Sequence, residues 1–354
     1  MLRPYVREEL PVSHPVADAL TERWSAGSRP GSRSDSYRIG LAIEGGAMRG
    51  VVSAGMLIAL EQLGLLAAFD AVYGASAGGV NGAYFVAGQA AFGTTIYYES
   101  INNRSFSSFG RLFTRRPVID IDFLIREVVV RRKPLDTAAV LSSPVPLTIL
   151  GTNADTGDRD LFGRCADERE LLDALRATTS VPVIGGPAFP FRGNRYFDGG
   201  IRESVPTRVA AEDGCTHILA LCTRPPGPFR TTSRRVLEHL LIERTLSRQH
   251  PALFEFYRER PAAYQRLLEE IALQSDSKQT NPAVLMIRPE SGRMVGGLER
   301  SRDRLVRAAA DGMRAVLRAF GVDFSWDLET LGAFDRHGQR ASLRIPLPQG
   351  TVQR

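Results

Sequence analysis

The stretch IGLAIEGGAMRGVVSAGM, residues 39–56, joins an apolar run to a glycine-rich turn and then to a second apolar run. Residues 39–43 have the length and composition of a buried strand, whereas the apolar pattern of residues 51–67 has the length of a helix. The turn between them, residues 44–50, therefore places free backbone N–H groups at the N-terminus of a helix, where a negative charge is stabilised. A strand that runs through such a turn into a helix favours an α/β fold.

Apolar runs and helical patterns continue to alternate after this stretch. We expect further helices at residues 77–90 and 169–178, and further strands at residues 71–73, 146–152, 195–197 and 217–222. This alternation predicts a three-layer α/β/α fold with a mostly parallel central sheet, and ligands are expected beyond the carboxyl ends of its strands.

The chain divides into four parts by composition. Residues 1–36 end in the polar stretch SAGSRPGSRSDS and are predicted to be an N-terminal arm and linker, and residues 37–225 form the expected main domain. Residues 226–325 carry helical patterns at 236–247, 251–259, 261–273 and 298–320, with a buried strand at 283–287, so we expect a helical extension that rejoins the sheet. Residues 326–354 are predicted to be a tail.

The glycine-rich turn EGGAMRG does not match either common nucleotide-binding loop. A Walker loop needs Gly-Lys-Ser/Thr where this chain has Gly50-Val51-Val52, and a dinucleotide fingerprint needs a glycine where Ala47 stands. One remaining interpretation is a turn whose N–H groups stabilise an oxyanion that forms during a reaction. The other is a tight turn in which the glycines serve the backbone alone.

A second motif, GASAG at residues 74–78, follows a predicted strand and precedes a predicted helix. This is the context of a nucleophile elbow, in which small neighbours leave the Ser76 hydroxyl exposed at the N-terminus of the helix. The five-residue pattern alone also arises by chance, so the strand-to-helix position is what makes Ser76 a candidate nucleophile.

A third motif, Asp198-Gly199-Gly200, closes the predicted strand 195–197. A carboxylate at the end of a strand can point into the same crevice as Ser76 and act as its general base, although a surface Asp-Gly turn is the common alternative. A histidine base is not favoured, because none of the five histidines falls at the carboxyl end of a predicted strand. These are His14, His217, His239, His250 and His337. We therefore expect a catalytic dyad of Ser76 and Asp198.

The charge of the chain does not indicate nucleic-acid binding. The formal net charge is +6, but Lys133 and Lys278 are the only lysines, and the arginines are interleaved with acids. One region is locally basic, and it contains Arg111, Arg115, Arg116, Arg131, Arg132 and Lys133. The first interpretation of this basic group is a solvated face. The alternative is a patch that makes peripheral contact with an anionic membrane.

Nothing in the sequence predicts export, a membrane span or a metal site. The N-terminus has charges and prolines where a signal peptide needs an apolar core, and no run of eighteen uninterrupted apolar residues occurs. Cys165, Cys215 and Cys222 have no metal-binding spacing and are an odd number, which indicates free thiols. We therefore expect a cytoplasmic protein whose site contains no metal and no cofactor.

Together, GGAMRG, GASAG and DGG, in this order and spacing, resemble the patatin-like phospholipase family, and residues 248–320 resemble the C-terminal extension of a bacterial branch of that family. The resemblance covers roughly residues 37–223 and implies a Ser-Asp dyad on a three-layer α/β/α fold, with Ser76 as nucleophile and Asp198 as base. The implied activity is hydrolysis of lipid carboxylic esters, of the phospholipase A or lysophospholipase type, with a lipid ester as the binding partner.

The resemblance also implies that Gly45, Gly46 and Ala47 form the oxyanion hole. Arg49 matches the basic residue of that turn, where it either fixes the loop or faces the developing charge. This chain has Glu44 where Asp is usual and Ala47 where a third glycine is usual. An alanine leaves its N–H available, provided that the position does not require a positive φ.

Two other functions are consistent with the same motifs. One is an α/β-hydrolase esterase with a Ser-His-Asp triad, although its glycine-rich loop and histidine are not well matched here. The other is a non-catalytic lipid-binding module that retains the fold.

Overall fold

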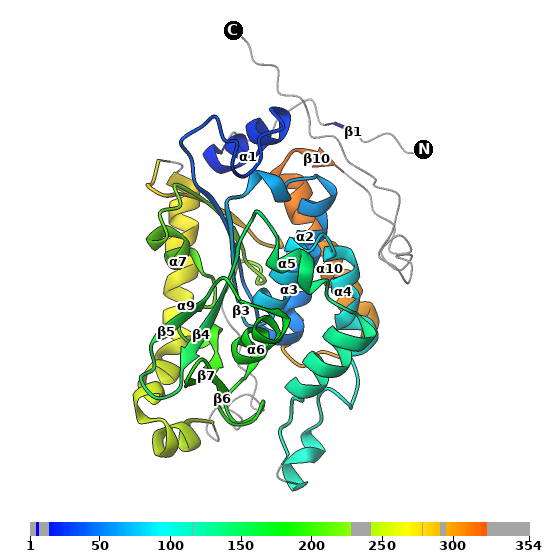
Figure 1. The fold of residues 1–354 in the computed structure, drawn as a ribbon, viewed down its shortest axis with the longest axis vertical. Coiled ribbons are helices and arrows are strands. Elements are labelled where there is room, and N and C mark those ends of the chain that lie inside the picture. The colour runs from blue at the N-terminus through cyan, green and yellow to red at the C-terminus, as the bar shows by residue number, and fades with distance from the viewer. Residues whose placement is uncertain are drawn as a thin grey trace.

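The computed structural model confirms the predicted α/β/α class (Figure 1). It describes residues 5–6, 14–114, 116–227, 242–277, 279–290 and 295–323. Within these residues, an eight-stranded sheet has the order β6-β7-β4-β3-β2-β8-β9, with β5 paired to β4. The strands are β2 (Ile39–Ile43), β3 (Ala71–Ala75), β4 (Leu147–Asn153), β5 (Arg159–Phe162), β6 (Phe189–Phe191), β7 (Asn194–Asp198), β8 (His217–Leu221) and β9 (Ala283–Ile287). A separate antiparallel pair joins β1 (Tyr5–Val6) to β10 (Val322–Asp323).

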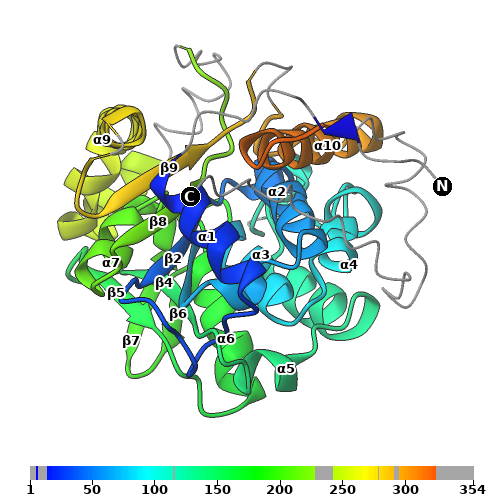
Figure 2. The same cartoon turned by 90° about the horizontal axis from the view of Figure 1, so that it is seen from above.

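Helices cover both faces of the sheet (Figure 2). On one face lie α2 (Val51–Gln62), α3 (Ala77–Val86), α4 (Ala90–Thr95), α6 (Glu168–Thr179) and α10 (Arg302–Ala319), and on the other lie α7 (Thr207–Glu212) and α9 (Pro251–Ser277). Helices α1 (Pro15–Ser25) and α5 (Thr137–Leu141) lie at the periphery, and Ile96–Ser100 and Phe123–Arg132 are π-helical. Short 3₁₀ turns occur at Ala47–Gly50, Leu66–Ala68, Phe109–Thr114 and Gly199–Ile201.

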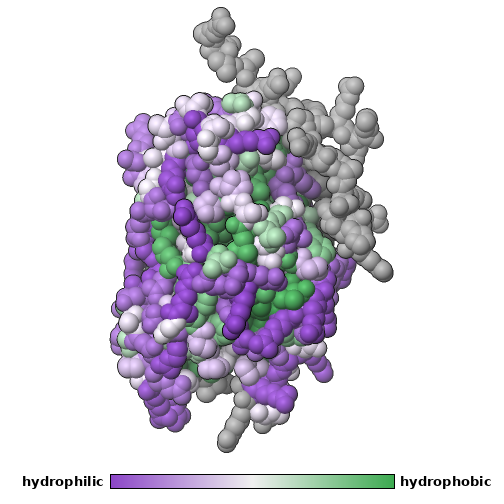
Figure 3. Space-filling view, viewed as in Figure 1, coloured by the Kyte–Doolittle hydropathy of each residue, from purple (hydrophilic) through white to green (hydrophobic). Residues whose placement is uncertain are grey.

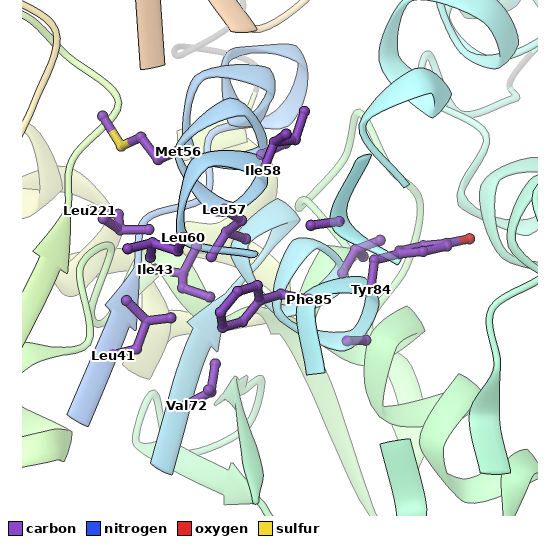
Figure 4. Packing of buried hydrophobic residues seen from close by; sticks show 14 of the residues in the cluster. Leu41, Ile43, Met56, Leu57, Ile58, Leu60, Val72, Tyr84, Phe85 and Leu221 are labelled. Carbon is purple, nitrogen blue, oxygen red and sulfur yellow. The ribbon is translucent and has the colours of Figure 1, made fainter. Parts of the chain in front are cut away.

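The hydrophobic core divides between the two faces as strand geometry requires. Successive side chains of a strand point to opposite faces, so Leu41 and Ile43 of β2 pack under α2 and α3, whereas Ala42 faces α7 and α9. Leu57 and Leu60 of α2 and Phe85 of α3 lie close to Leu41 and Val72 (Figure 4). The strands β2, β3, β4, β8 and β9 are parallel, and they are buried on both sides.

The segment predicted as an arm and linker is partly a packed helix. Helix α1 buries Val16 and Leu20, and its Arg23 side chain is only 2% exposed. The Arg23 guanidinium donates to Asp35 at 2.7 Å and to Asp70 at 2.7 Å. The expectation was wrong for residues 15–25, which form this packed helix, whereas most of residues 26–36 are exposed and connect α1 to β2.

The helical extension has one long helix where two were predicted. Helix α9 continues through Pro261, which lacks an N–H and so leaves one intrahelical hydrogen bond unmade. Strand β9 has the bounds expected for it and pairs in parallel with β8, so the extension rejoins the sheet. The helix predicted at residues 236–247 lies mostly outside the described residues, as does the tail at 326–354.

Helix α10 crosses α2 at very short range. A Cβ at Gly55 would lie 2.0 Å from the carbonyl oxygen of Ala309, and a Cβ at Gly312 would lie 2.1 Å from that of Val52. Only glycine allows this approach, because real Cβ atoms do not come so close to a carbonyl oxygen. The crossing therefore holds α10 of the extension firmly on the main domain.

Glu61, at the end of α2, is expected to make stability depend on pH. Burial raises its pKa from 4.5 to about 7, although its carboxylate accepts the N–H groups of Ala90 and Ala91. The folded state binds this proton more tightly than the unfolded state does, so stability falls as pH rises from about 4.5 to about 7. In wild-type protein we attribute about 2 kcal/mol of the decrease in the free energy of unfolding over this pH range to Glu61. This part of the decrease should be absent in Glu61→Gln, as measured by urea denaturation across the range. Glu22→Gln, on the exposed side of α1, should leave it unchanged.

Candidate active site

The candidate site lies where β2 and β3 end side by side. Ile43 pairs with Gly74 in parallel register, so the turn after β2 lies next to the turn after β3. A Cβ at Gly45 would lie 2.4 Å from the carbonyl oxygen of Ala75 and 2.8 Å from Cβ of Ser76. The glycine-rich turn and the serine motif are therefore in direct contact.

Ser76 occupies a strained turn between β3 and α3. Its φ of 56° and ψ of −132° lie outside the regions that non-glycine residues ordinarily adopt. A Cβ at Gly78 would lie 2.3 Å from the carbonyl oxygen of Ile43, which explains why a glycine follows the serine by two positions. The Ser76 side chain thus stands at the N-terminus of α3, as the nucleophile-elbow interpretation requires.

Asp198 reaches Ser76 by a route that the sequence did not predict. Strand β7 is antiparallel to β4, so its carboxyl end does not belong to the shared edge expected of parallel strands. Strand β4 runs beyond β3, however, and Gly151 pairs with Asp198 while Leu150 pairs with Ala75. This overrun brings the carboxylate of Asp198 level with the turn that carries Ser76.

The Ser76 hydroxyl donates to Oδ2 of Asp198 over 2.5 Å. Oδ1 of Asp198 accepts the N–H of Gly200 at 2.8 Å, and Asp198 is only 5% exposed. Burial raises the pKa of this carboxyl, while the nearby Arg260 guanidinium and the hydrogen bonds from Ser76 and Gly200 oppose that rise. The carboxylate is thus an acceptor already aligned on the hydroxyl, with a stronger affinity for a proton than an ordinary aspartate has.

Thr178, at the end of α6, fixes the serine turn from behind. Its hydroxyl accepts the N–H of Ser76 at 2.8 Å and donates to the carbonyl oxygen of Leu150 at 2.5 Å. The sequence analysis gave Thr178 no role in the site. The available signal was its position: Thr178 is the last residue of the helix predicted at 169–178, and that helix was expected to pack on the sheet.

The glycine-rich turn leaves several donors available. Among the described residues, none accepts a hydrogen bond from the N–H of Gly45, Gly46 or Ala47. Gly46 has a φ of 132° and Ala47 a φ of 52°, so the alanine adopts the left-handed conformation that a glycine would adopt more readily. The departure at Ala47 therefore costs strain of about 1–2 kcal/mol without removing the N–H group.

Glu44 and Arg49 belong to one buried network behind this turn. Oε2 of Glu44 accepts the N–H of Thr223 at 2.5 Å, and Oε1 accepts the hydroxyl of Tyr264 at 2.7 Å. Arg49 donates to the Thr223 hydroxyl at 2.9 Å and lies 3.4 Å from Oε1 of Glu44, while its guanidinium covers Gly46. Glutamate is long enough to reach Tyr264 on α9, which ties the extension to the turn.

These residues line a cavity of about 1100 Å³. The main domain contributes Ser76, Asp198 and the turn Gly45–Ala47, and the extension contributes Tyr257, Arg260 and Tyr264. A narrow apolar slot of about 50 Å³ opens beside Ser76. Its lining includes Val80, Tyr97, Ile101, Phe106, Ile121 and Leu124.

The described histidines lie away from this cavity. His14 caps α1, His217 begins β8 beside Tyr37, and Nδ1 of His250 lies 3.0 Å from the carbonyl oxygen of Ala154. None of the three is among the residues that line the cavity. His239 and His337 lie outside the described residues.

Part of the basic group is paired with acidic side chains. In the basic group, Arg111 pairs with Asp120, Arg131 with Glu127 and Lys133 with Glu99, and Arg115 lies outside the described residues. On the face in Figure 3, hydrophobic surface lies between hydrophilic side chains.

The described ranges contain neither a metal-binding cluster nor a membrane-spanning helix. No group of three or more His, Cys, Asp or Glu there is arranged to hold a metal, and no helix there is long and apolar enough to cross a membrane. Cys165, Cys215 and Cys222 are free thiols, as predicted.

Comparison with known proteins finds one matching family model and a few distant relatives. A family model described as patatin-like phospholipase matches residues 41–211. The uncharacterized protein YjjU of Escherichia coli K12 is 28% identical over 197 residues, which cover 55% of this chain and 54% of that protein. Mouse 1-acylglycerol-3-phosphate O-acyltransferase Pnpla3 is 31% identical over 94 residues, which cover 26% of this chain and 22% of that protein. The match thus spans about half the length of the first relative and less of the second.

Among solved structures, VipD from Legionella pneumophila aligns with a TM-score of 0.39 and 10% sequence identity. The alignment covers 89% of this chain and 70% of that chain.

Proposed function

Residues 41–211 belong to the patatin-like phospholipase family, and from this premise we propose that the protein is a serine acyl hydrolase that cleaves carboxylic esters of lipids. Ser76 is the nucleophile and Asp198 the general base, in a dyad without histidine. The observation that carries the proposal is the 2.5 Å hydrogen bond from the Ser76 hydroxyl to the buried Asp198 carboxylate inside the cavity.

In the first half of the reaction, Asp198 accepts the proton of Ser76 as the serine oxygen attacks the ester carbonyl. The tetrahedral intermediate collapses, the alcohol leaves with the proton from Asp198, and the acyl group stays on Ser76. In the second half, Asp198 accepts a proton from water, which attacks the acyl-enzyme. The fatty acid leaves, and the proton returns to Ser76.

The N–H groups of Gly45, Gly46 and Ala47 are the proposed oxyanion hole. Gly45 lies against Ser76, and Gly46 and Ala47 line the same cavity. Among the described residues these N–H groups have no hydrogen-bond acceptor, so they remain available to the oxyanion. Fixed donors of this kind contribute about 10² to 10³ in rate per group. Arg49 acts here as a positioning residue, because its partners Thr223 and Glu44 hold it against the turn.

The apolar slot beside Ser76 is the proposed site for the start of the acyl chain. Val80 lies one turn along α3 from Ser76 and lines this slot. Val80→Phe should fill it and shift the preference toward short acyl chains, lowering kcat/KM for a long-chain ester about tenfold relative to an acetyl ester. Ester hydrolysis over a chain-length series measures this change.

Val86→Phe is the matched control, because Val86 is buried on the same helix but does not line the slot. Over-packing alone should destabilise both variants without changing chain-length preference. An unchanged preference in Val80→Phe would contradict the assignment of the slot.

The proposal is tested by fatty-acid release from phospholipids, lysophospholipids and neutral glycerides by the purified full chain. Release from at least one class is expected, and folded protein that cleaves none would instead support a non-catalytic lipid-binding module. Replacing each histidine in turn tests the rival triad. If one such change lowered activity as much as Ser76→Ala does, the dyad would be wrong.

The name of the mouse relative describes transfer of an acyl group to 1-acylglycerol 3-phosphate. If this chain also transferred acyl groups, an acceptor alcohol would attack the acyl-enzyme in place of water. Product analysis with and without an added acceptor alcohol separates the two outcomes.

Peripheral contact with an anionic membrane through the basic group is a further part of the proposal, and vesicle sedimentation with and without anionic lipid tests it.

A further inference from the structure

The cavity around Ser76 has more positive than negative side chains. The charged residues in its lining are Glu44, Arg49, Arg104, Asp198, Arg224, Arg260, Glu299 and Arg300. A site that binds only a neutral ester has no need of such an excess, because arginines next to a general base reduce its basicity. The arrangement therefore calls for a ligand with negative charge.

Most of these charges have partners within the protein. The carboxylate of Glu44 accepts from Thr223 and Tyr264, and that of Glu299 accepts the N–H groups of Arg300 and Ser301. Arg300 donates to the carbonyl oxygen of Ser107.

Arg49 is likewise held by Thr223 and Glu44, and Arg224 lies over the ring of Tyr264. These side chains build the wall of the cavity.

Arg104 lines the cavity without an ion pair or side-chain hydrogen bond to the described residues, but its side chain is exposed. Arg260 combines that lack of a partner with a half-buried position next to the dyad. It belongs to α9, lines the cavity, and makes no ion pair or side-chain hydrogen bond within the part of the chain that the structure describes. A Cβ at Gly200 would lie 3.9 Å from Nη2 of Arg260 and 3.0 Å from Oδ1 of Asp198, so guanidinium and carboxylate approach the same glycine. The guanidinium is close to the dyad, but its donors are not used by Asp198.

Given the proposed function, we infer that Arg260 binds the phosphate group of the substrate and so selects phospholipids over neutral lipid esters. A guanidinium presents paired N–H donors that match two phosphate oxygens, and this contact is strongest where water is partly excluded. Arg260 is half-buried and close to the acyl-transfer centre, so it suits a phosphate joined through glycerol to the reacting ester. The specificity would then come from α9, which lies outside the family match at residues 41–211.

The test compares two substrates with one short acyl chain, a 1-acylglycerol 3-phosphate and the corresponding 1-acylglycerol. Arg260→Gln should raise KM for the phosphate-bearing substrate by about 10- to 100-fold and leave KM for the neutral substrate within about twofold. Arg260→Lys should raise KM for this substrate less than Arg260→Gln does, because lysine keeps the positive charge but lacks the paired N–H donors. Arg258→Gln is the matched control, since Arg258 lies on the same helix, is 58% exposed and pairs with Glu255.

A second readout follows from the position of Arg260 near Asp198. Loss of its charge should raise the pKa of Asp198 and move the acid limb of the kcat/KM profile to higher pH for both substrates. Arg260→Lys should leave that limb in place. A merely structural role would not produce this pair of results.

Three outcomes would overturn the inference: equal losses on both substrates, no loss on either, or a loss that Arg258→Gln reproduces. Inhibition by inorganic phosphate shows whether Arg260 binds the phosphate of a lipid headgroup or only free phosphate. If Arg260→Gln abolished inhibition by inorganic phosphate but left KM for the phosphate-bearing lipid unchanged, the site would bind free phosphate and the headgroup assignment would be wrong. Failure of the proposed function itself looks different, because wild-type protein would then cleave neither ester, or Ser76→Ala would still cleave both.

Discussion

Ser76→Ala is expected to lower kcat for ester hydrolysis by at least about 10⁴-fold, because Ser76 is the residue that forms the acyl-enzyme in the proposed mechanism. In that mechanism the hydroxyl oxygen both attacks the carbonyl and carries the acyl group between the two half-reactions. Its removal leaves the N–H groups of the oxyanion turn and the cavity intact, so residual activity should reflect substrate binding alone. Steady-state hydrolysis of a chromogenic short-chain ester measures the loss.

Ser204→Ala provides the control for this result. Ser204 lines the same cavity, but its hydroxyl donates to the carbonyl oxygen of Gly200 at 2.8 Å and is not on the strained turn. We expect Ser204→Ala to keep kcat within about threefold of the wild-type value, because the substitution removes only one hydrogen bond between neutral groups. Comparable losses in the two variants would mean that Ser76 is not the nucleophile.

Asp198→Asn is expected to lower kcat by about 10⁴-fold while keeping the shape of the side chain. An amide cannot accept the proton of Ser76, so the serine must attack without a base. The N–H of Gly200 still finds an acceptor in the side-chain oxygen of the substituted amide, and stability should therefore change little. Asp155→Asn, at an exposed carboxylate paired with Arg195, should leave activity unchanged.

In the proposed mechanism the same carboxylate sets the pH dependence of the reaction. The base acts only when it is deprotonated, and burial raises its pKa above the ordinary aspartate value of 3.8. Activity should therefore fall as pH falls through this raised pKa, with an acid limb above the ordinary aspartate range. In Asp198→Asn the residual activity should lose that limb. A limb that persists unchanged in this variant would assign it to another group.

Much of this site could be predicted because its chemistry is local in sequence. The strand Ile39–Ile43 has the predicted bounds, and GGAMRG and GASAG each follow a strand whose parallel neighbour ends beside it. Parallel strands bring their carboxyl ends to one edge of the sheet. Two motifs that each follow such a strand were therefore expected to lie close together. Asp198 was predicted by residue type and position after a strand, but the antiparallel direction of β7 was not.

Other parts of the site depend on long-range contacts that no local pattern reports. Tyr264 donates to Glu44 across 220 positions, and Arg260 approaches Asp198 from a helix whose pattern is that of any amphipathic surface helix. The condition placed on Ala47, that it avoid a positive φ, is not met in the structure. The surrounding turn sets the φ angle of Ala47, and the residue type alone does not predict that angle.

The prediction of an arm before residue 37 missed helix α1 for a similar reason. Composition marks residues 25–36 as a linker, and most of them are exposed, but it does not show that Arg23 is buried between Asp35 and Asp70. Burial of a charged side chain requires partners placed by the fold, and composition gives no sign of them.

The central claim, a Ser76–Asp198 dyad that works without histidine, is tested most directly by covalent labelling with a fluorophosphonate, followed by peptide mass spectrometry. The account predicts one adduct per folded chain, located on Ser76, formed in wild-type protein and in each histidine variant, and slowed by about 10³-fold or more in Asp198→Asn. An adduct on another residue, or labelling of Ser76 that is unchanged by Asp198→Asn but lost in a histidine variant, would contradict it.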